Sequence, residues 1–215
     1  MQLKLQKNAK ITLSILFIFI GIGLLTFNYF GSIKSNVFNE KNIQLLEQQI
    51  VVPQELIDVE TGDDVGEEPT ITTPATDGDG YIGYLTVPDV NVKRGFTNFD
   101  SPYNQLKYNI MLIEGSTMPD VKNGNLILAG HNGHSSYSFF KDLYKLDMGA
   151  YAYINYNGKI YSYKLKNRYD VPKVGTISIT RNPDVSTLTL ITCHHTDNDK
   201  QVVFIFELED VNIAQ

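Results

Sequence analysis

From Tyr81 onward the chain carries the hydrophobic pattern of a β protein. Short runs rich in β-branched and aromatic residues recur there, and turn-forming residues separate them. The runs are 81–88, 125–130, 151–157, 159–165, 176–180, 186–193 and 201–209. Such residues favour strands, and many short strands with regular turn signals are typical of a closed barrel or a sandwich. The pattern therefore predicts one all-β domain over residues 81–215.

Two segments inside this domain carry a more specific local signal. Asn157 and Gly158 separate two of the runs, and Asn-Gly is a strong signal for a two-residue β-hairpin. The segment SFFKDLYKL, residues 138–146, is the good helical candidate of the domain. Its apolar spacing predicts a helix of about two turns.

The N-terminal part of the chain has a different residue pattern, a long uncharged apolar stretch. No charged residue lies between Ile11 and Ile33, and three lysines precede this stretch. Twenty-three helical residues span about 34 Å, enough to cross a hydrocarbon core of about 30 Å. A cleaved signal peptide has a shorter apolar region of about 7–15 residues and a small-x-small cleavage site. We therefore predict an uncleaved transmembrane signal-anchor over 11–33, with residues 1–10 in the cytoplasm and the remainder outside.

Residues 34–80 connect this anchor to the β domain. Apolar residues at helical spacing allow a short helix over 35–52, which Pro53 would end. From residue 54 to residue 80 the chain is acidic, rich in Thr, Gly and Pro, and without an aromatic residue. Such a segment buries too little apolar surface to offset its ordering entropy. We interpret 34–80 as an acidic, flexible linker, and its acids lack the spacing of an EF-hand calcium loop.

The charge distribution narrows the class of partner. The net charge is −6, and ten of the 24 acidic residues lie within 42–80, where there is no Lys or Arg. The rest of the chain holds 18 basic and 14 acidic residues. This balance is too mild for the clustered Lys and Arg of a nucleic-acid interface, so we exclude nucleic acid as a partner.

Two predicted strand ends carry candidate catalytic residues. Cys193, the single cysteine, closes the run 186–193 and is followed by the polar stretch HHTDNDKQ. His131 follows the run 125–130 in the same way. A strand end is a rigid support close to solvent, and a thiolate nucleophile needs a neighbouring base. Taken singly, the cysteine also fits a small core residue, and the histidine fits a loop residue bonded to backbone.

Together these segments resemble the sortase family. STLTLITC contains the family signature TLxTC at residues 189–193, and LAGHNG resembles the family's histidine segment. The histidine precedes the cysteine by 62 residues, and both this order and this separation fit. The opening YIGYLTVPDVNV and the stretch from SFFKDLYKL to KIYSYKL resemble the family as well. The resemblance covers about residues 81–209, and the N-terminal anchor matches the family's usual layout.

The resemblance implies an eight-stranded sortase-type β-barrel with one or two short helices, and no cofactor. It implies a bacterial cell-membrane protein with an extracellular catalytic domain. The implied reaction cleaves the C-terminal LPxTG-like sorting signal of a surface or pilin protein between Thr and Gly. Cys193 would form a thioester, His131 would act as acid and base, and Thr192 would line or shape the substrate site. A peptidoglycan precursor amine or a pilin lysine would then accept the acyl group.

One departure from the family pattern leaves alternatives open. The family places an arginine at the start of the strand after the cysteine, and by register this position falls on Gln201, with Lys200 beside it. The resemblance implies that this arginine holds the substrate and stabilises the developing oxyanion. Either Gln201 or Lys200 takes over this role, or Arg168 or Arg181 enters the site from elsewhere. The third alternative is a degenerate sortase that binds sorting signals without turnover.

Two histidines follow the cysteine directly. Neighbouring residues of an extended chain point to opposite sides, which argues against a zinc site that combines His194, His195 and Cys193. We predict no metal, and we expect His194 to border the substrate groove and to tune the thiol. A papain-like protease is excluded, because in that class the cysteine precedes the histidine.

Overall fold

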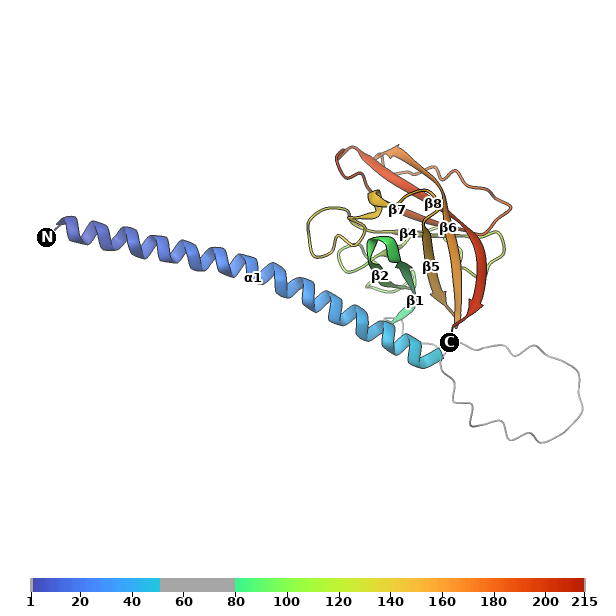
Figure 1. The fold of residues 1–215 in the computed structure, drawn as a ribbon, viewed down its shortest axis with the longest axis horizontal. Coiled ribbons are helices and arrows are strands. Elements are labelled where there is room, and N and C mark those ends of the chain that lie inside the picture. The colour runs from blue at the N-terminus through green and yellow to red at the C-terminus, as the bar shows by residue number, and fades with distance from the viewer. Residues whose placement is uncertain (1, 51–79, 215) are drawn as a thin grey trace, which may run out of the picture.

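A long helix lies beside a β-barrel in the computed structural model, which describes residues 2–50 and 80–214 (Figure 1). The helix α1 spans Gln2–Ile50. The strands are β1 (Tyr81–Val87), β2 (Val92–Thr97), β3 (Met111–Leu112), β4 (Asn125–Ala129), β5 (Tyr151–Tyr156), β6 (Lys159–Pro172), β7 (Thr187–Cys193) and β8 (Lys200–Ile213). Two 3₁₀ turns, η1 (Pro88–Val90) and η2 (Leu143–Lys145), complete the described elements.

The eight strands form one sheet in the order β2-β1-β5-β6-β8-β7-β4-β3. Its edge strands β2 and β3 approach each other, so the sheet is a nearly closed barrel, as the resemblance implied. Neighbouring strands are antiparallel except β4 and β7, which run parallel. The predicted hairpin at Asn157 and Gly158 is confirmed: both residues have positive φ, 48° and 69°, between β5 and β6. Both angles are those of a type I′ turn.

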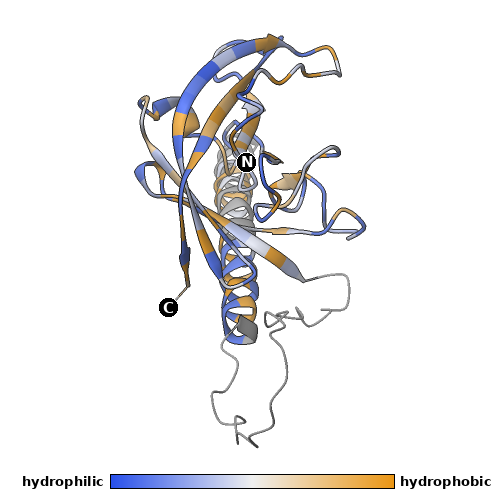
Figure 2. Ribbon diagram, turned by 90° about the vertical axis from the view of Figure 1, so that its right-hand side faces the viewer, coloured by the Kyte–Doolittle hydropathy of each residue, from blue (hydrophilic) through white to orange (hydrophobic). Residues whose placement is uncertain are grey.

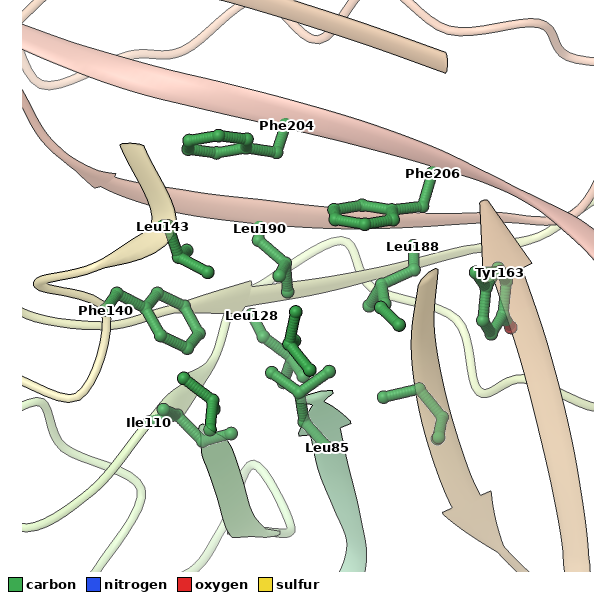
Figure 3. Packing of buried hydrophobic residues seen from close by; sticks show 14 of the residues in the cluster. Leu85, Ile110, Leu128, Phe140, Leu143, Tyr163, Leu188, Leu190, Phe204 and Phe206 are labelled. Carbon is green, nitrogen blue, oxygen red and sulfur yellow. The ribbon is translucent and has the colours of Figure 1, made fainter. Parts of the chain in front are cut away.

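The barrel interior is filled by large apolar side chains from most of the strands (Figure 3). The alternation predicted for β7 is confirmed. Leu188 and Leu190 are fully buried in the interior, whereas Ile191 belongs to a second, smaller cluster on the other face of β4 and β7. Hydropathy correspondingly alternates along the strand ribbons in Figure 2. Cys193 shares the parity of Ile191, so it lies on the face outside the main core.

Two sequence predictions were wrong in detail. Residues 176–180 form no strand; Ile177 and Ile179 cover the second cluster, and the Thr180 amide donates to the Tyr169 hydroxyl at 2.8 Å. Residues 138–146 contain only the single turn η2 in place of a two-turn helix.

Packing explains this second difference. The buried residues Phe140, Leu143 and Leu146 recur every three positions and belong to the main core cluster. A three-residue period suits a 3₁₀ turn better than an α-helix. The short strands β2 and β3 carry no clear alternation and were not predicted.

Residues 34–50, which we assigned to the linker with a possible short helix over 35–52, are the C-terminal part of α1. This part of the helix contacts β1 and β2. Asn39 is 2% exposed; its amide donates to the Lys93 carbonyl at 3.1 Å, and its Oδ1 accepts from the Gly95 amide at 3.1 Å. Ile43 is 1% exposed. The helix is therefore docked on the barrel by apolar and polar contacts. The rest of the predicted linker, 51–79, lies outside the described residues.

The N-terminal part of α1 carries large apolar side chains on its surface. Eight of them between Leu13 and Ile22 are 48–68% exposed. Within the part of the chain that the structure describes, no helix qualifies as a membrane span by length and hydropathy.

The docking of α1 gives a stability prediction. Ile43→Ala should lower the free energy of unfolding by about 2–4 kcal/mol, because it removes a buried branched side chain from a packed interface. The measurement is urea denaturation of the full chain followed by circular dichroism. Leu45→Ala, on the same helix but 46% exposed, is the matched control and should change stability by less than about 0.5 kcal/mol. Equal effects of the two substitutions would contradict the docked arrangement.

Candidate active site

The parallel pairing of β4 and β7 brings the histidine and the cysteine segments together. The register runs from Asn125↔Thr187 to Ala129↔Ile191, and the Gly130 amide continues it by donating to the Ile191 carbonyl at 3.1 Å. His131 and Cys193 each lie two residues beyond the last pair. Neighbouring strands are about 4.8 Å apart, so the two residues occupy adjacent strand ends on the same face. Both side chains are half-buried.

Local packing explains why a glycine precedes this histidine. A Cβ atom on Gly130 would lie 2.6 Å from the ring of Phe140, closer than two carbon atoms approach without displacing one another. The Phe140 amide also donates to the His131 carbonyl at 3.0 Å. The ring of Phe140, at the end of the core, therefore fixes the backbone that carries His131.

Thr192 and Asn132 tie the two strand ends to each other. The Thr192 hydroxyl, in a residue that is 5% exposed, donates to the Gly130 carbonyl at 2.8 Å. The Asn132 amide donates to the Cys193 carbonyl at 2.9 Å. Thr192 thus supports the two strand ends through its hydroxyl. It is not among the residues that line the cleft described next. The sequence analysis did not identify Asn132. The only signal for it in the sequence is its position directly after His131.

A cleft of about 700 Å³ opens beside Cys193. Its walls come from the loop after β4, the segment around η2, the end of β6 and the β7–β8 loop. The lining residues are Asn132, Gly133, His134, Lys141, Asp142, Tyr144, Lys173, Cys193, His194, His195 and Asn198. His131 is not among them, whereas His134, three residues later, lines the cleft.

The two histidines after the cysteine lie close together, contrary to the expectation from an extended chain. Their ring centroids are 4.9 Å apart, because the chain leaves the strand at Cys193 and turns. His195 stacks on Tyr144 with centroids 4.4 Å apart. His194 borders the cleft, as expected. Among the described residues, no group of three His, Cys, Asp or Glu side chains is arranged to hold a metal ion.

His194 also organises the β7–β8 loop. Its Nδ1 accepts hydrogen bonds from the amides of Thr196 and Asp197 at 3.2 and 3.1 Å. With Nδ1 as an acceptor, the ring N–H is at Nε2, which lies 3.7 Å from an oxygen of Asp170. The histidine fixes the loop that follows the cysteine.

Gln201 and Lys200 occupy opposite faces of β8. Gln201 pairs directly with Cys193 across the antiparallel ladder, and paired residues share a face with Cβ atoms about 4.5–5.5 Å apart. Lys200 alternates to the other face, where its ammonium lies 3.1 Å from Asp197. This hydrogen bond lowers the pKa of Asp197 and raises the pKa of Lys200 relative to their ordinary values. Of the two candidates, only Gln201 shares the face of the cysteine.

The two arginines that we considered, Arg168 and Arg181, bind backbone carbonyls elsewhere in the barrel. Arg168 donates to the carbonyls of Tyr144 and Leu146 at 3.1 and 3.3 Å, and thus caps η2. Arg181 donates to three carbonyls, including those of Asn123 and Val185. That position is at the start of β7, a strand length of about 20 Å from Cys193.

The Thr192 contact gives a prediction that separates a supporting role from a substrate role. Thr192→Val keeps the shape but leaves the Gly130 carbonyl without this donor, which should lower the free energy of unfolding by about 1–3 kcal/mol. Thr192→Ser keeps a hydroxyl and is the matched control, with a clearly smaller loss. Chemical denaturation measures both. A Val variant as stable as the Ser variant would show that the hydroxyl does not hold the strand ends.

Comparisons with known proteins agree with this geometry. The family described as "Sortase domain" matches residues 85–209, more than half of the chain. No curated protein sequence matches the chain.

Among solved structures, sortase A from Listeria monocytogenes is similar at 24% identity, over 64% of this chain and 92% of that chain, with a TM-score of 0.54. Sortase C1 from Streptococcus agalactiae is similar at 25% identity, over 65% and 72%, with a TM-score of 0.56. Sortase C from Clostridium perfringens, solved with the C-terminal cell wall sorting motif, is similar at 25% identity, over 64% and 75%, with a TM-score of 0.54. With its barrel and the extent of the family match, the chain belongs to the sortase family of cysteine transpeptidases.

Proposed function

We propose that this protein is a membrane-anchored sortase that cleaves a C-terminal LPxTG-like sorting signal and transfers the acyl group to an amine. One observation carries the proposal. The parallel pairing of β4 and β7 sets a histidine and the single cysteine at adjacent strand ends, and the cysteine lines a cleft of about 700 Å³. This volume is within the range of small-molecule and peptide side-chain sites.

The chemistry divides between the two residues. The Cys193 thiolate attacks the threonine carbonyl of the signal, and the tetrahedral intermediate collapses to a thioester as the Thr–Gly bond breaks. His131 donates its proton to the leaving glycine amine. The acceptor amine then attacks the thioester, gives its proton to His131 and releases the thiolate. Because the second step regenerates both groups, the cycle needs no cofactor.

We assign the oxyanion donor to Gln201. It shares the face of Cys193, and its carboxamide has no hydrogen-bond partner among the described residues. Lys200 is engaged with Asp197, and the two arginines considered above are engaged with carbonyls. A neutral amide stabilises a developing negative charge less than a guanidinium does, since charge-assisted hydrogen bonds are roughly twice as strong.

Two observations support the substrate and the location. The similar sortase C from Clostridium perfringens was solved with the C-terminal cell wall sorting motif, which supports a sorting signal as the substrate class here. The acceptor is a peptidoglycan precursor amine or a pilin lysine. The uncharged segment 11–33, with half-exposed apolar side chains on α1, supports a membrane anchor. Lysines before it favour a cytoplasmic N-terminus.

One prediction of the proposed function concerns the acyl-enzyme. Full-length protein in detergent, incubated with an LPxTG-type peptide, should show by intact mass spectrometry an adduct of the peptide up to its threonine. Cys193→Ala should abolish the adduct, and His131→Ala should slow its formation by about 100-fold or more, the usual contribution of a general acid–base group.

His134→Ala is the matched control, because His134 lines the same cleft, and it should retain most of the rate. Equal losses in the two histidine variants would remove His131 from its assigned role. Tight peptide binding without any adduct in the wild type would favour the alternative, a sortase-like module that binds sorting signals without turnover.

Another prediction of the proposed function concerns the oxyanion donor. Gln201→Arg should raise the rate of transpeptidation by about tenfold, because a charge-assisted hydrogen bond exceeds a neutral one by about 1–1.5 kcal/mol. Gln201→Leu is the paired variant and should lower the rate. A fluorogenic sorting peptide with an added amine measures both. No gain in the Arg variant and no loss in the Leu variant would mean that another group binds the oxyanion.

A further inference from the structure

A second cleft lies where α1 meets the barrel, away from the cysteine. It has a volume of about 330 Å³. The helix contributes Lys34 and Phe38 to its wall, and the barrel contributes Arg94, Tyr103, Tyr108 and Tyr137. Because the buried side chain of Asn39 bonds to both Lys93 and Gly95, the helix wall is held in a defined place relative to the barrel wall.

Arg94 is a cation without a paired anion. Its guanidinium donates to the Asn36 side chain and lies over the Phe139 ring, 3.9 Å from the centroid. Among the described residues no carboxylate lies within ion-pair distance of it, and Glu40 acts on it only as a more distant charge. Burial lowers the pKa of Arg94 from its ordinary value, which reflects the cost of removing this charge from water. A guanidinium has five N–H donors in a planar fork that matches phosphate oxygens.

The floor of this cleft holds an unsatisfied acceptor. Asn109 is 6% exposed, and its amide donates to the Tyr81 hydroxyl and to the Gly95 carbonyl. Its Oδ1 is buried without a hydrogen-bond partner among the described residues. A buried acceptor that lacks a donor is unfavourable. Phosphate oxygens also accept, so this atom would pair only with a donor of a ligand, such as a headgroup hydroxyl.

The rim of the cleft is aromatic and exposed. Phe38, Tyr103, Tyr108 and Tyr137 are 39–53% exposed, and Tyr103 packs edge-on against Tyr108 with centroids 5.6 Å apart. The ammonium of Lys107 lies over the Tyr108 ring, 4.6 Å from its centroid. Rings with an apolar body and a polar end, accompanied by lysines, are typical of the membrane–water interface.

The position along α1 fits this composition. The uncharged segment ends at Ile33, and Lys34 is the next residue. Phe38 lies five residues beyond Ile33, about 7.5 Å along the helix axis. Each headgroup layer of a bilayer is about 5–8 Å thick. If residues 11–33 cross the hydrocarbon core, the cleft lies at the depth of the headgroups.

We propose that this cleft binds the headgroup of an anionic phospholipid, with Lys34 and Arg94 as ligands of its phosphate and the aromatic rim in the interface. The bound lipid would hold the barrel against the membrane beside its anchor. The proposal rests on the membrane anchor of the proposed function and is independent of the transpeptidase chemistry.

Full-length protein in a neutral detergent, titrated with phosphatidylglycerol or phosphatidylcholine and followed by native mass spectrometry, tests the proposal. Phosphatidylglycerol should bind at least about fivefold more tightly, and Lys34→Gln and Arg94→Gln should each weaken it by about fivefold, the typical effect of one basic residue near a lipid surface. Lys159→Gln, in the exposed start of β6, is the matched control and should leave the affinity unchanged. Because Arg94 also contacts α1, thermal unfolding of each variant is compared, and the exposed Lys34 provides the variant least coupled to folding.

Equal affinity for the two lipids, or charge variants that bind like the wild type, would overturn the proposal. Equally tight binding of free glycerol 3-phosphate would identify a soluble anion as the ligand and would overturn the lipid assignment. Incorporation into lipid nanodiscs tests the anchor separately. Protein that fails to enter nanodiscs yet keeps its preference for phosphatidylglycerol would refute the anchor and leave the headgroup site standing.

Discussion

The site depends on the parallel pairing of β4 with β7. These strands are about 60 residues apart in the sequence, and a shift of their register by one residue would turn one set of side chains to the other face. A buried contact holds the register: Oδ1 of Asn125 accepts hydrogen bonds from the hydroxyls of Thr187 and Thr189 at 2.9 and 2.8 Å. The Thr192 hydroxyl fixes the other end of the pair. With both ends fixed, the cysteine and the histidine come to adjacent positions.

The residue paired with the cysteine on β8 is neutral, although Lys141 and Lys173 line the same cleft. Gln201 stands opposite Cys193, and the nearby Lys200 is turned away toward Asp197. Arg168 and Arg181 satisfy the carbonyls of turns that have few other donors. Both arginines therefore support the backbone of the barrel. The donor that we propose for the transition state, Gln201, is neutral.

The C-terminal part of helix α1 belongs to the folded domain. Residues 33–48 lie along β1 and β2, where Asn39 and Ile43 are almost completely buried and Glu47 accepts a hydrogen bond from Tyr84 at 2.9 Å. A flexible linker starting at residue 34 would leave the barrel free to move relative to the N-terminal segment. A docked helix instead gives the barrel, and with it the cleft beside Cys193, a defined orientation relative to the N-terminal segment (Figure 1).

The sequence by itself determined the features that depend on neighbouring residues. Alternation predicted the two faces of β7, and Asn-Gly predicted the β5–β6 hairpin, because both signals are local in the backbone. The motif around Cys193 and the segment around His131 identified the family and the candidate pair.

Only the tertiary structure decided the features that depend on partners far along the chain. Residues 176–180 have the composition of a strand but cover an apolar cluster, and 138–146 became a single turn because its apolar residues pack on the barrel end. Asn132 and Asn39 act through carbonyls and amides about 60 residues away. A sequence shows which groups can donate or be buried, but which partner each one meets is set by the closure of the barrel.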